Sequence, residues 1–284
     1  MCDWKTRVEE WFGTTLNNYE VDWKEIYDHL NTTSRNDYDS IANYISADGN
    51  RSKIPLKLLL DGFRNETSVH YKLKCNVILL RACQRKYLDI IDELLDCPYI
   101  VISNQTFINV MKYNHSEVVE KLLKSPKVDP SAKDNEALFL TIEYGIVDMF
   151  NCLLDDPRVN PAARNNEAII KASMRGNVHI VKRLLRDHRV DPSDQNNRAV
   201  VVACISNRIK IVDILLENIN VDPSAQDNNA IISASKRGYI DIVKRLLLDP
   251  RVDPSARNNK ALIKATKYDH PEVVKVLIND PRVN

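Results

Sequence analysis

Five Asp-Pro or Asn-Pro pairs recur in the second half of the chain, each 31 residues after the one before. The pairs are Asp129-Pro130, Asn160-Pro161, Asp191-Pro192, Asp222-Pro223 and Asp253-Pro254. A fixed period of about 20 to 50 residues is typical of stacked repeats, in which no single unit buries its own apolar face. The period therefore predicts an array of repeats, and it favours binding over catalysis as the function.

Each repeat has the pattern of two helices joined by a tight turn. Counting the Asp or Asn of the Pro pair as position zero, Asn stands at position six and is interpreted, with the Asp or Asn before it, as a helix N-cap. Small residues at positions eight and twelve share one helical face, where two helices can approach closely. Gly, Asn or Asp at position sixteen suits a left-handed helix end. The apolar stripe of Val178, Ile180, Val181 and Leu184 then predicts a second helix, which the next Pro pair ends.

Two looser copies precede the five regular repeats. Asn76, Ala82 and Leu94-Leu95 match one repeat, and Asn104 and Leu122-Leu123 match the next. The sequence thus predicts seven helix pairs from about residue 72 onwards, with the regular 31-residue period beginning at residue 129. Residues 58–62 are a degraded match to the end of an eighth pair.

The repeat resembles the ankyrin repeat. Ala172 and Gly176 align with the family's A-x-x-x-G, and Ile180-Val181-x-x-Leu184-Leu185 aligns with its I-V-x-x-L-L. The T-P-L-H segment is replaced by residues 167–170, and the period is two residues shorter than the usual 33 or so. The deficit falls where the family has a β-hairpin, which leaves a hairpin or a compact turn as alternatives. The Asp-Pro-rich style is similar to expanded ankyrin families of amoebae and their giant viruses.

The resemblance implies an all-α, ankyrin-like solenoid of about seven stacked helix-turn-helix repeats. Residues 66–284 are predicted to form this solenoid and residues 1–65 a helical N-terminal region. All three tryptophans, Trp4, Trp11 and Trp23, lie in that first region. We interpret it as a cap that covers the open end of the array. The alternative is a recruitment module, and deleting residues 1–65 distinguishes the two, because only loss of a cap exposes apolar surface.

Composition excludes several classes of function. The chain has 40 Lys and Arg against 39 Asp and Glu, which argues against an avid nucleic-acid or membrane binder. It has no apolar leader after Met1 and no apolar run of about 18 residues, so neither a signal peptide nor a membrane span is expected. Six scattered cysteines without a C-x-x-C pair indicate a reducing compartment. We expect a cytoplasmic location (host cytoplasm for a viral protein), with the nucleus also open.

Catalytic chemistry is not expected. The six histidines share no metal-ligand spacing and are interpreted as solvated helix-surface residues. With only 6 glycines and no G-x-x-x-x-G-K-[ST], G-x-G-x-x-G or G-x-S-x-G motif, a phosphate cradle or nucleophile elbow has no basis. The recurring Asp-Pro carboxylates are interpreted as turn residues, in which the side chain accepts a backbone bond and Pro fixes φ. We predict no catalytic residue, cofactor, metal or small-molecule substrate.

Partner contacts are predicted by position from the resemblance, because the ankyrin family usually binds through its turn tips and concave groove. The corresponding positions four, fourteen and fifteen vary between repeats, as expected where packing imposes nothing. Of these fifteen residues seven are basic and one is acidic, which indicates a mildly basic groove and a partner with an acidic segment. The predicted binding residues are Lys133, Glu143, Tyr144, Arg164, Met174, Arg175, Ile205, Lys236, Arg237, Arg257, Lys267 and Tyr268.

Three functions follow from these observations. The first is a non-enzymatic, monomeric scaffold that binds another protein through the groove. The second is an adaptor whose N-terminal region recruits other machinery, such as a ubiquitin ligase, to a target held by the repeats. The third is a nucleic-acid binder, whose affinity would fall steeply with salt; the near-zero net charge argues against it.

Overall fold

The computed structural model describes residues 69–97 and 100–283, and in these ranges the protein is all-helical, with no strand. The chain divides into two compact units, residues 1–132 and 133–284. The described residues form seven helix pairs, α5–α6 to α17–α18, as the repeat pattern predicts. The N-terminal region 1–65, including its three tryptophans and the boundary after residue 65, lies outside the described residues and stays a prediction.

The first unit contains two helix pairs. Their helices are α5 (Val69–Arg85), α6 (Leu88–Asp96), α7 (Asn104–Val110), which continues as a 3₁₀ turn (Met111–Tyr113), and α8 (Ser116–Leu123). The first helices α5 and α7 pack together, and so do the second helices α6 and α8. Helix α7 has a conventional N-cap, because the Ser103 hydroxyl accepts a 3.1 Å bond from the Thr106 amide.

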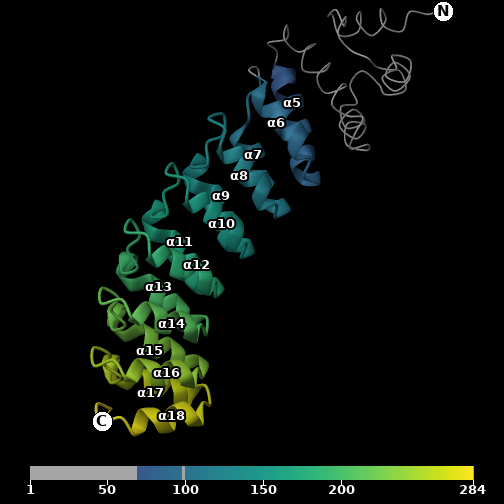
Figure 1. Cartoon of the computed structure of the whole chain (residues 1–284). Coiled ribbons are helices and arrows are strands. Elements are labelled where there is room, and N and C mark those ends of the chain that lie inside the picture. The colour runs from purple at the N-terminus through teal and green to yellow at the C-terminus, as the bar shows by residue number, and fades with distance from the viewer. Residues whose placement is uncertain (1–68, 98–99, 284) are drawn as a thin grey trace, which may run out of the picture. The chain divides into compact units, whose positions relative to one another are not determined.

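The second unit contains five helix pairs stacked in chain order (Figure 1). The first helices α11, α13, α15 and α17 pack on one another, and the second helices α10, α12, α14, α16 and α18 form a parallel row. The first helices are α9 (Ala132–Tyr144), α11 (Ala163–Arg175), α13 (Asp194–Ile205), α15 (Ala225–Arg237) and α17 (Ala256–Lys267). The second helices are α10 (Val147–Leu154), α12 (Val178–Leu185), α14 (Ile209–Leu216), α16 (Ile240–Leu247) and α18 (Pro271–Ile278).

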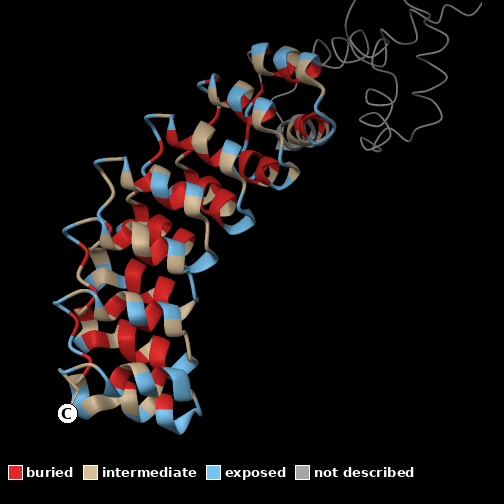
Figure 2. Cartoon of the chain, turned by 60° about the horizontal axis from the view of Figure 1, so that its bottom comes forward, coloured by how far each residue is buried: buried red, intermediate tan, exposed pale blue. Residues whose placement is uncertain are grey.

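The core runs between the two rows of helices (Figure 2). The small residues at positions eight and twelve are at most 1% exposed, which confirms that they mark the close approach of neighbouring first helices. In α12 three residues of the predicted stripe, Ile180, Val181 and Leu184, are fully inaccessible, and the fourth, Val178, is partly buried. The small buried residues are Ala137, Thr141, Ala168, Ala172, Ala199, Ala203, Ala230, Ala234, Ala261 and Ala265.

Position sixteen ends each first helix in the left-handed conformation, as predicted. The φ angles there are 70° at Gly145, 89° at Gly176, 57° at Asn207, 74° at Gly238 and 58° at Asp269. Glycine adopts this conformation without strain, and Asn and Asp tolerate it better than other side chains do. The tight turn between the two helices of a repeat is therefore encoded at one residue.

A compact left-handed turn, and not a β-hairpin, interrupts the start of each first helix of the second unit, inside the bounds given above. Positions four, five and six all have positive φ and ψ, as at Arg164 (56°, 41°), Asn165 (55°, 58°) and Asn166 (58°, 29°). The same three positions are left-handed in α9, α13, α15 and α17. A left-handed residue other than glycine costs roughly 1–2 kcal/mol. Asn or Asp at positions five and six lowers that cost, which explains why these residue types recur there.

The Asn at position six binds the next repeat, so its interpretation as a helix N-cap is wrong. Its side-chain oxygen accepts a bond from the backbone N–H at position zero of the following repeat, 25 residues on. The donor–acceptor distances are 2.8 Å for Asn135–Asn160, 2.8 Å for Asn166–Asp191, 2.7 Å for Asn197–Asp222 and 2.7 Å for Asn228–Asp253. A hydrogen bond between neighbouring repeats, as well as packing, therefore fixes the repeat period.

The carboxylate or amide at position zero shapes its own turn, as predicted. The Asp191 Oδ1 atom accepts bonds from the Ser193 amide at 2.9 Å and from the Ser193 hydroxyl at 2.6 Å. Asp129, Asp222 and Asp253 bond their own Ser in the same way. These carboxylates are turn residues with backbone partners, which is the structural role expected from the Asp-Pro pattern.

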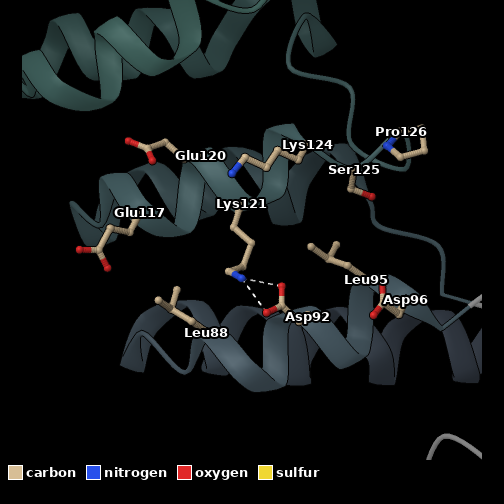
Figure 3. Close-up of a pocket in the computed structure, with 10 residues that line it drawn as sticks. All are labelled: Leu88, Asp92, Leu95, Asp96, Glu117, Glu120, Lys121, Lys124, Ser125 and Pro126. Carbon is tan, nitrogen blue, oxygen red and sulfur yellow. Dashed lines mark hydrogen bonds and ion pairs between the residues drawn. The ribbon is translucent and has the colours of Figure 1, made fainter.

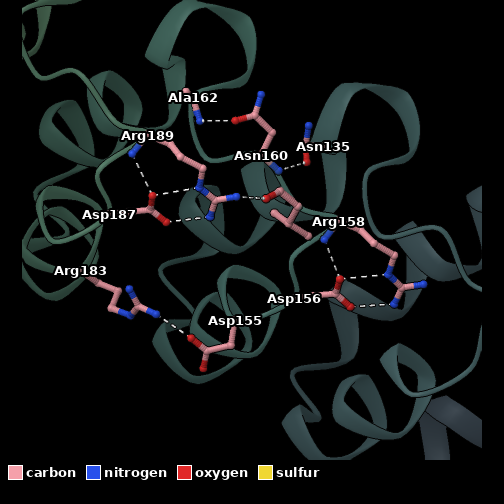
Figure 4. A network of polar contacts seen from close by, with 10 residues as sticks. Asn135, Asp155, Asp156, Arg158, Asn160, Ala162, Arg183, Asp187 and Arg189 are labelled. Carbon is pink, nitrogen blue, oxygen red and sulfur yellow. Dashed lines mark hydrogen bonds and ion pairs between the residues drawn. The ribbon is translucent and has the colours of Figure 1, made fainter.

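An Arg that pairs with an Asp of its own long turn also binds a carbonyl of the preceding long turn (Figure 4). Arg189 donates to both oxygens of Asp187, at 2.9 and 2.7 Å, and its third nitrogen reaches back to the Val159 carbonyl at 2.9 Å. This pairing lowers the pKa of Asp187 to about 2, because the guanidinium stabilises the carboxylate. Arg251 and Arg282 make the same two contacts, with Asp249 and Val221 and with Asp280 and Val252.

One repeat of the second unit lacks this pair. Asn218 stands where the other long turns have Asp, and Asn220 stands where they have Arg. Between them Ile219 is 89% exposed, the largest value among the exposed apolar residues of the described chain. The series of Arg bonds to the preceding turn is therefore interrupted at this point.

The position-six hydrogen bond can be measured with two matched substitutions. Asn197→Ala removes the acceptor of the Asp222 amide, whereas Asn196→Ala changes a neighbouring exposed residue with the same left-handed backbone. Both variants place alanine at positive φ and carry that strain. The difference between their free energies of unfolding therefore reports the hydrogen bond alone. We expect Asn197→Ala to unfold with about 1–3 kcal/mol less free energy than Asn196→Ala in urea. Equal losses would contradict the inter-repeat role of Asn197.

The missing Arg–Asp pair predicts a stabilising double substitution. Asn218→Asp with Asn220→Arg should add about 1 kcal/mol, or roughly 2–4 °C in Tm; Asn218→Asp alone is the control and should add little. The folded pKa of such a carboxyl is lowered, as at Asp187. Its contribution is therefore complete above the unfolded pKa of about 4 and is lost as the pH falls toward 2. Thermal melts at pH 7 that show no gain, or a gain that persists unchanged at pH 2, would refute the proposed role of the pair.

Candidate functional site

The predicted partner residues fall in two places of the second unit. Position four is the first residue of each left-handed turn, and positions fourteen and fifteen lie at the C-terminal end of each first helix, position fifteen being the C-cap of α13 and α17. Because the repeats are stacked, position four forms one row from α9 to α17, and positions fourteen and fifteen form another. We call the face made by these positions the first-helix face.

The side chains at position four are held by the preceding repeat. Arg164 donates to the Lys133 carbonyl at 2.8 Å and pairs with Glu136 at 2.9 Å. Gln195 and Gln226 donate to the carbonyls of Asn165 and Asn196, at 2.7 and 3.0 Å. Arg257 donates to the Gln226 carbonyl at 3.1 Å and pairs with Asp227 at 2.9 Å. The expectation that packing imposes nothing at this position is wrong, because these residues connect successive turns.

Positions fourteen and fifteen place large side chains in solvent. Tyr144 is 52% exposed, Met174 42% and Tyr268 43%. Arg175 forms an ion pair with Glu143 of the preceding repeat. The Lys236 ammonium lies 5.3 Å from the centre of the Tyr268 ring, within the range of a cation–π interaction. Exposed aromatic and thioether groups thus alternate with charged groups along this row.

The following repeat fixes the helix ends that carry these side chains. Asn177 donates to the Ile142 carbonyl at 2.7 Å, Arg208 to the Met174 carbonyl at 3.3 Å, and Arg237 to the Ile205 carbonyl at 3.1 Å. His270 Nε2 lies 3.0 Å from the Lys236 carbonyl oxygen. These carbonyls belong to the last turns of first helices, where the regular series of intrahelical hydrogen bonds ends. The residues at positions fourteen and fifteen are therefore presented on a backbone held by the following repeat.

Two histidines differ from their predicted role as purely solvated residues. His270 contacts the end of α15, and in the first unit His115 Nε2 lies 3.2 Å from the Gln84 carbonyl oxygen at the end of α5. Both are helix-end partners of the preceding repeat. Their spacing in the sequence gave no indication of this contact, because the acceptor lies 31 to 34 residues away.

The first-helix face extends to positions seven and eleven, which the sequence interpretation missed. These positions precede position fourteen by seven and three residues, so they lie on the same side of the helix. On α11 they hold Glu167 and Lys171, which pair with each other at 3.3 Å. On α17 they hold Lys260 and Lys264. The helical spacing was a signal that could have identified them.

A cavity of about 510 Å³ lies in the first unit between the second helices α6 and α8 (Figure 3). Lys121 crosses it and donates to both oxygens of Asp92, each at 2.6 Å. Glu117 at its edge pairs with Lys86 at 2.9 Å. The polar groups named here are thus joined in ion pairs, and they do not converge on a common point in the cavity.

Three cysteines of the described residues are buried, namely Cys83, Cys97 and Cys204. Burial raises the pKa of Cys83 and of Cys204 to about 12, so both remain protonated at neutral pH. A nucleophile or metal ligand requires the thiolate. Both cysteines therefore act as small apolar core residues. Within residues 69–97 and 100–283, no group of three or more His, Cys, Asp or Glu is placed to hold a metal ion.

Comparison with known families identifies the fold. The model of ankyrin repeats (3 copies) matches residues 107–195, 138–227 and 221–284, which together cover more than half of the chain. The chain belongs to the ankyrin-repeat family, and it contains a protein–protein interaction module. No curated protein matches the chain. In the part of the chain that the structure describes, no helix is both long enough and apolar enough to cross a lipid bilayer.

Proposed function

We propose that this protein is a non-enzymatic scaffold that binds another protein through the first-helix face of its repeats. The observation that carries the proposal is the row of exposed large side chains at positions fourteen and fifteen, namely Tyr144, Met174 and Tyr268. Packing within the array does not require an aromatic or apolar group at these positions, because position fourteen also holds Lys236 and Lys267 and position fifteen also holds Ser206. Their exposure is therefore better accounted for by a partner than by stability.

The chemistry of the row suits protein recognition. Tyr and Arg are enriched at binding hot spots, and Met adapts its shape to a partner. Arg175 and Arg237 flank the apolar groups, with Ile205 between them. The hydrogen bonds that hold the helix ends keep the row ordered before binding, which lowers the entropy that binding costs.

The adaptor function remains the alternative. It assigns recruitment of other machinery, such as a ubiquitin ligase, to residues 1–65, which lie outside the described residues, and target binding to the same first-helix face. Residues 66–284 form the repeat array under either hypothesis. The buried thiols of Cys83 and Cys204 suit a reducing compartment such as the cytoplasm, and we propose that the scaffold acts there as a monomer.

Replacing exposed apolar residues on and off the first-helix face tests the scaffold function. The variant Tyr144→Ser with Met174→Ser changes the face, and the control Ile219→Ser with Leu248→Ser changes two exposed residues outside it. The amount of partner protein that the full chain captures from its native cells should fall about tenfold or more with the first variant, as for hot-spot residues. It should be unchanged with the control. Quantitative mass spectrometry of the captured proteins gives the readout. Equal capture by both variants would exclude the first-helix face as the binding surface.

A further inference from the structure

The first-helix face changes charge from one end of the second unit to the other. At positions seven, eleven, fourteen and fifteen, helix α9 presents two acidic residues and no basic one, whereas α17 presents three lysines and no acidic residue. The helices between them carry intermediate charge. The residues on α9 are Glu136, Leu140, Glu143 and Tyr144, and those on α17 are Lys260, Lys264, Lys267 and Tyr268.

At the α9 and α11 end, charges of opposite sign neutralise one another. Glu136 pairs with Arg164 at 2.9 Å, and Glu143 pairs with Arg175. Lys171 pairs with Glu167 of its own helix at 3.3 Å. The basic residues of this end are thus already engaged by carboxylates of the same chain.

At the α15 and α17 end, the positive charges have no such partners. Helix α17 contains no carboxylate, and the single carboxylate of α15, Asp227, pairs with Arg257. Among the described residues, none forms an ion pair with Lys236, Arg237, Lys260, Lys264 or Lys267. Three of these cations contact neutral groups. Lys236 and Lys264 lie 5.3 and 5.9 Å from the centre of the Tyr268 ring, and Arg237 donates to a backbone carbonyl.

We infer that α15 and α17 hold an acidic peptide segment of the partner, with Tyr268 at the centre of the contact. This inference rests on the scaffold function proposed above and specifies where on the first-helix face the charged part of the partner lies. Five cations on α15 and α17, two of them within 6 Å of the exposed Tyr268 ring, provide charge complementarity for carboxylates, and the ring provides an apolar surface for the peptide's other side chains.

The spacing of the lysines sets the kind of peptide. Lys260 and Lys267 are seven residues apart on a helix, which corresponds to roughly 10 Å along its axis. An extended chain covers that distance in about three residues. Neighbouring helices lie about 8–10 Å apart, so a segment crossing from α17 to α15 meets cations at a similar interval. An extended segment with an acidic residue at about every third position therefore fits the surface.

A peptide fits this surface better than a nucleic acid does. A long polyanion laid along the first-helix face would meet Glu143 and Glu136 at the α9 end, where the face is acidic or neutralised. Binding of single strands also uses several aromatic groups in succession, and α15 and α17 together present Tyr268 alone at position fifteen. A short acidic segment avoids both conflicts.

Fluorescence anisotropy with the full chain tests the inference. The probe is a labelled short peptide with glutamate at every third residue, and a peptide with glutamine at those positions is its control. We expect Lys264→Glu with Lys267→Glu to weaken binding of the acidic peptide at least tenfold, and Lys264→Gln with Lys267→Gln to weaken it less. The matched control, Lys182→Glu with Arg186→Glu, makes the same change of charge on an exposed residue of α12 and on its exposed C-cap, and it should bind as the unmodified chain does. Thermal melts confirm that each variant is folded.

The outcomes separate this inference from the scaffold function. No binding of the acidic peptide by the unmodified chain, or equal losses in the α17 and α12 variants, overturns the inference. The scaffold function is tested separately, by the partner-capture experiment with Tyr144→Ser and Met174→Ser. Tighter binding of a short single-stranded oligonucleotide than of the peptide, lost in the α17 variants, also overturns it in favour of nucleic acid.

Discussion

The hydrogen bond between one repeat's Asn and the next repeat's backbone is the interaction on which the second unit most depends. The Asn at position six reaches its acceptor geometry only because three successive residues are left-handed. That conformation costs roughly 1–2 kcal/mol for each residue other than glycine, and a single hydrogen bond returns about 0.5–1.5 kcal/mol net. The turn is therefore stable only in the stack, where the neighbour also supplies buried apolar contacts. A single repeat is therefore not expected to fold stably without its neighbours.

Local sequence signals predicted much of the fold. Small residues at positions eight and twelve, the left-handed residue at position sixteen and the seven helix pairs in the described residues were all readable from spacing, because each depends on contacts close in sequence or on strict periodicity. The left-handed turn was not predicted, because Asp or Asn before Asn suits an N-cap equally well. The N-cap and the left-handed turn differ in the partner of the Asn side chain. In the structure Asn166 accepts a bond from the backbone N–H of Asp191, which lies 25 residues later in the sequence.

The same limit applies to the candidate site. The resemblance to the ankyrin repeat placed Tyr144, Met174 and Tyr268 at contact positions, and all three are exposed in the structure. The sequence could not tell which basic residues are already engaged, because ion pairs such as Glu143–Arg175 join different repeats. The sequence therefore predicted a mildly basic groove without indicating where along it the free positive charge lies. With the ion pairs in view, positive charge without a carboxylate partner is concentrated on α15 and α17.

The most direct test of the account is amide hydrogen exchange of the folded chain, followed residue by residue by NMR. The account predicts that the backbone N–H groups of Asp191, Asp222 and Asp253, which follow helix-ending turns, exchange as slowly as those of Val212 in the core of α14. Exchange of these three amides at the rate of an unstructured turn would contradict the account, because the Asn side chains would then not be holding neighbouring repeats together.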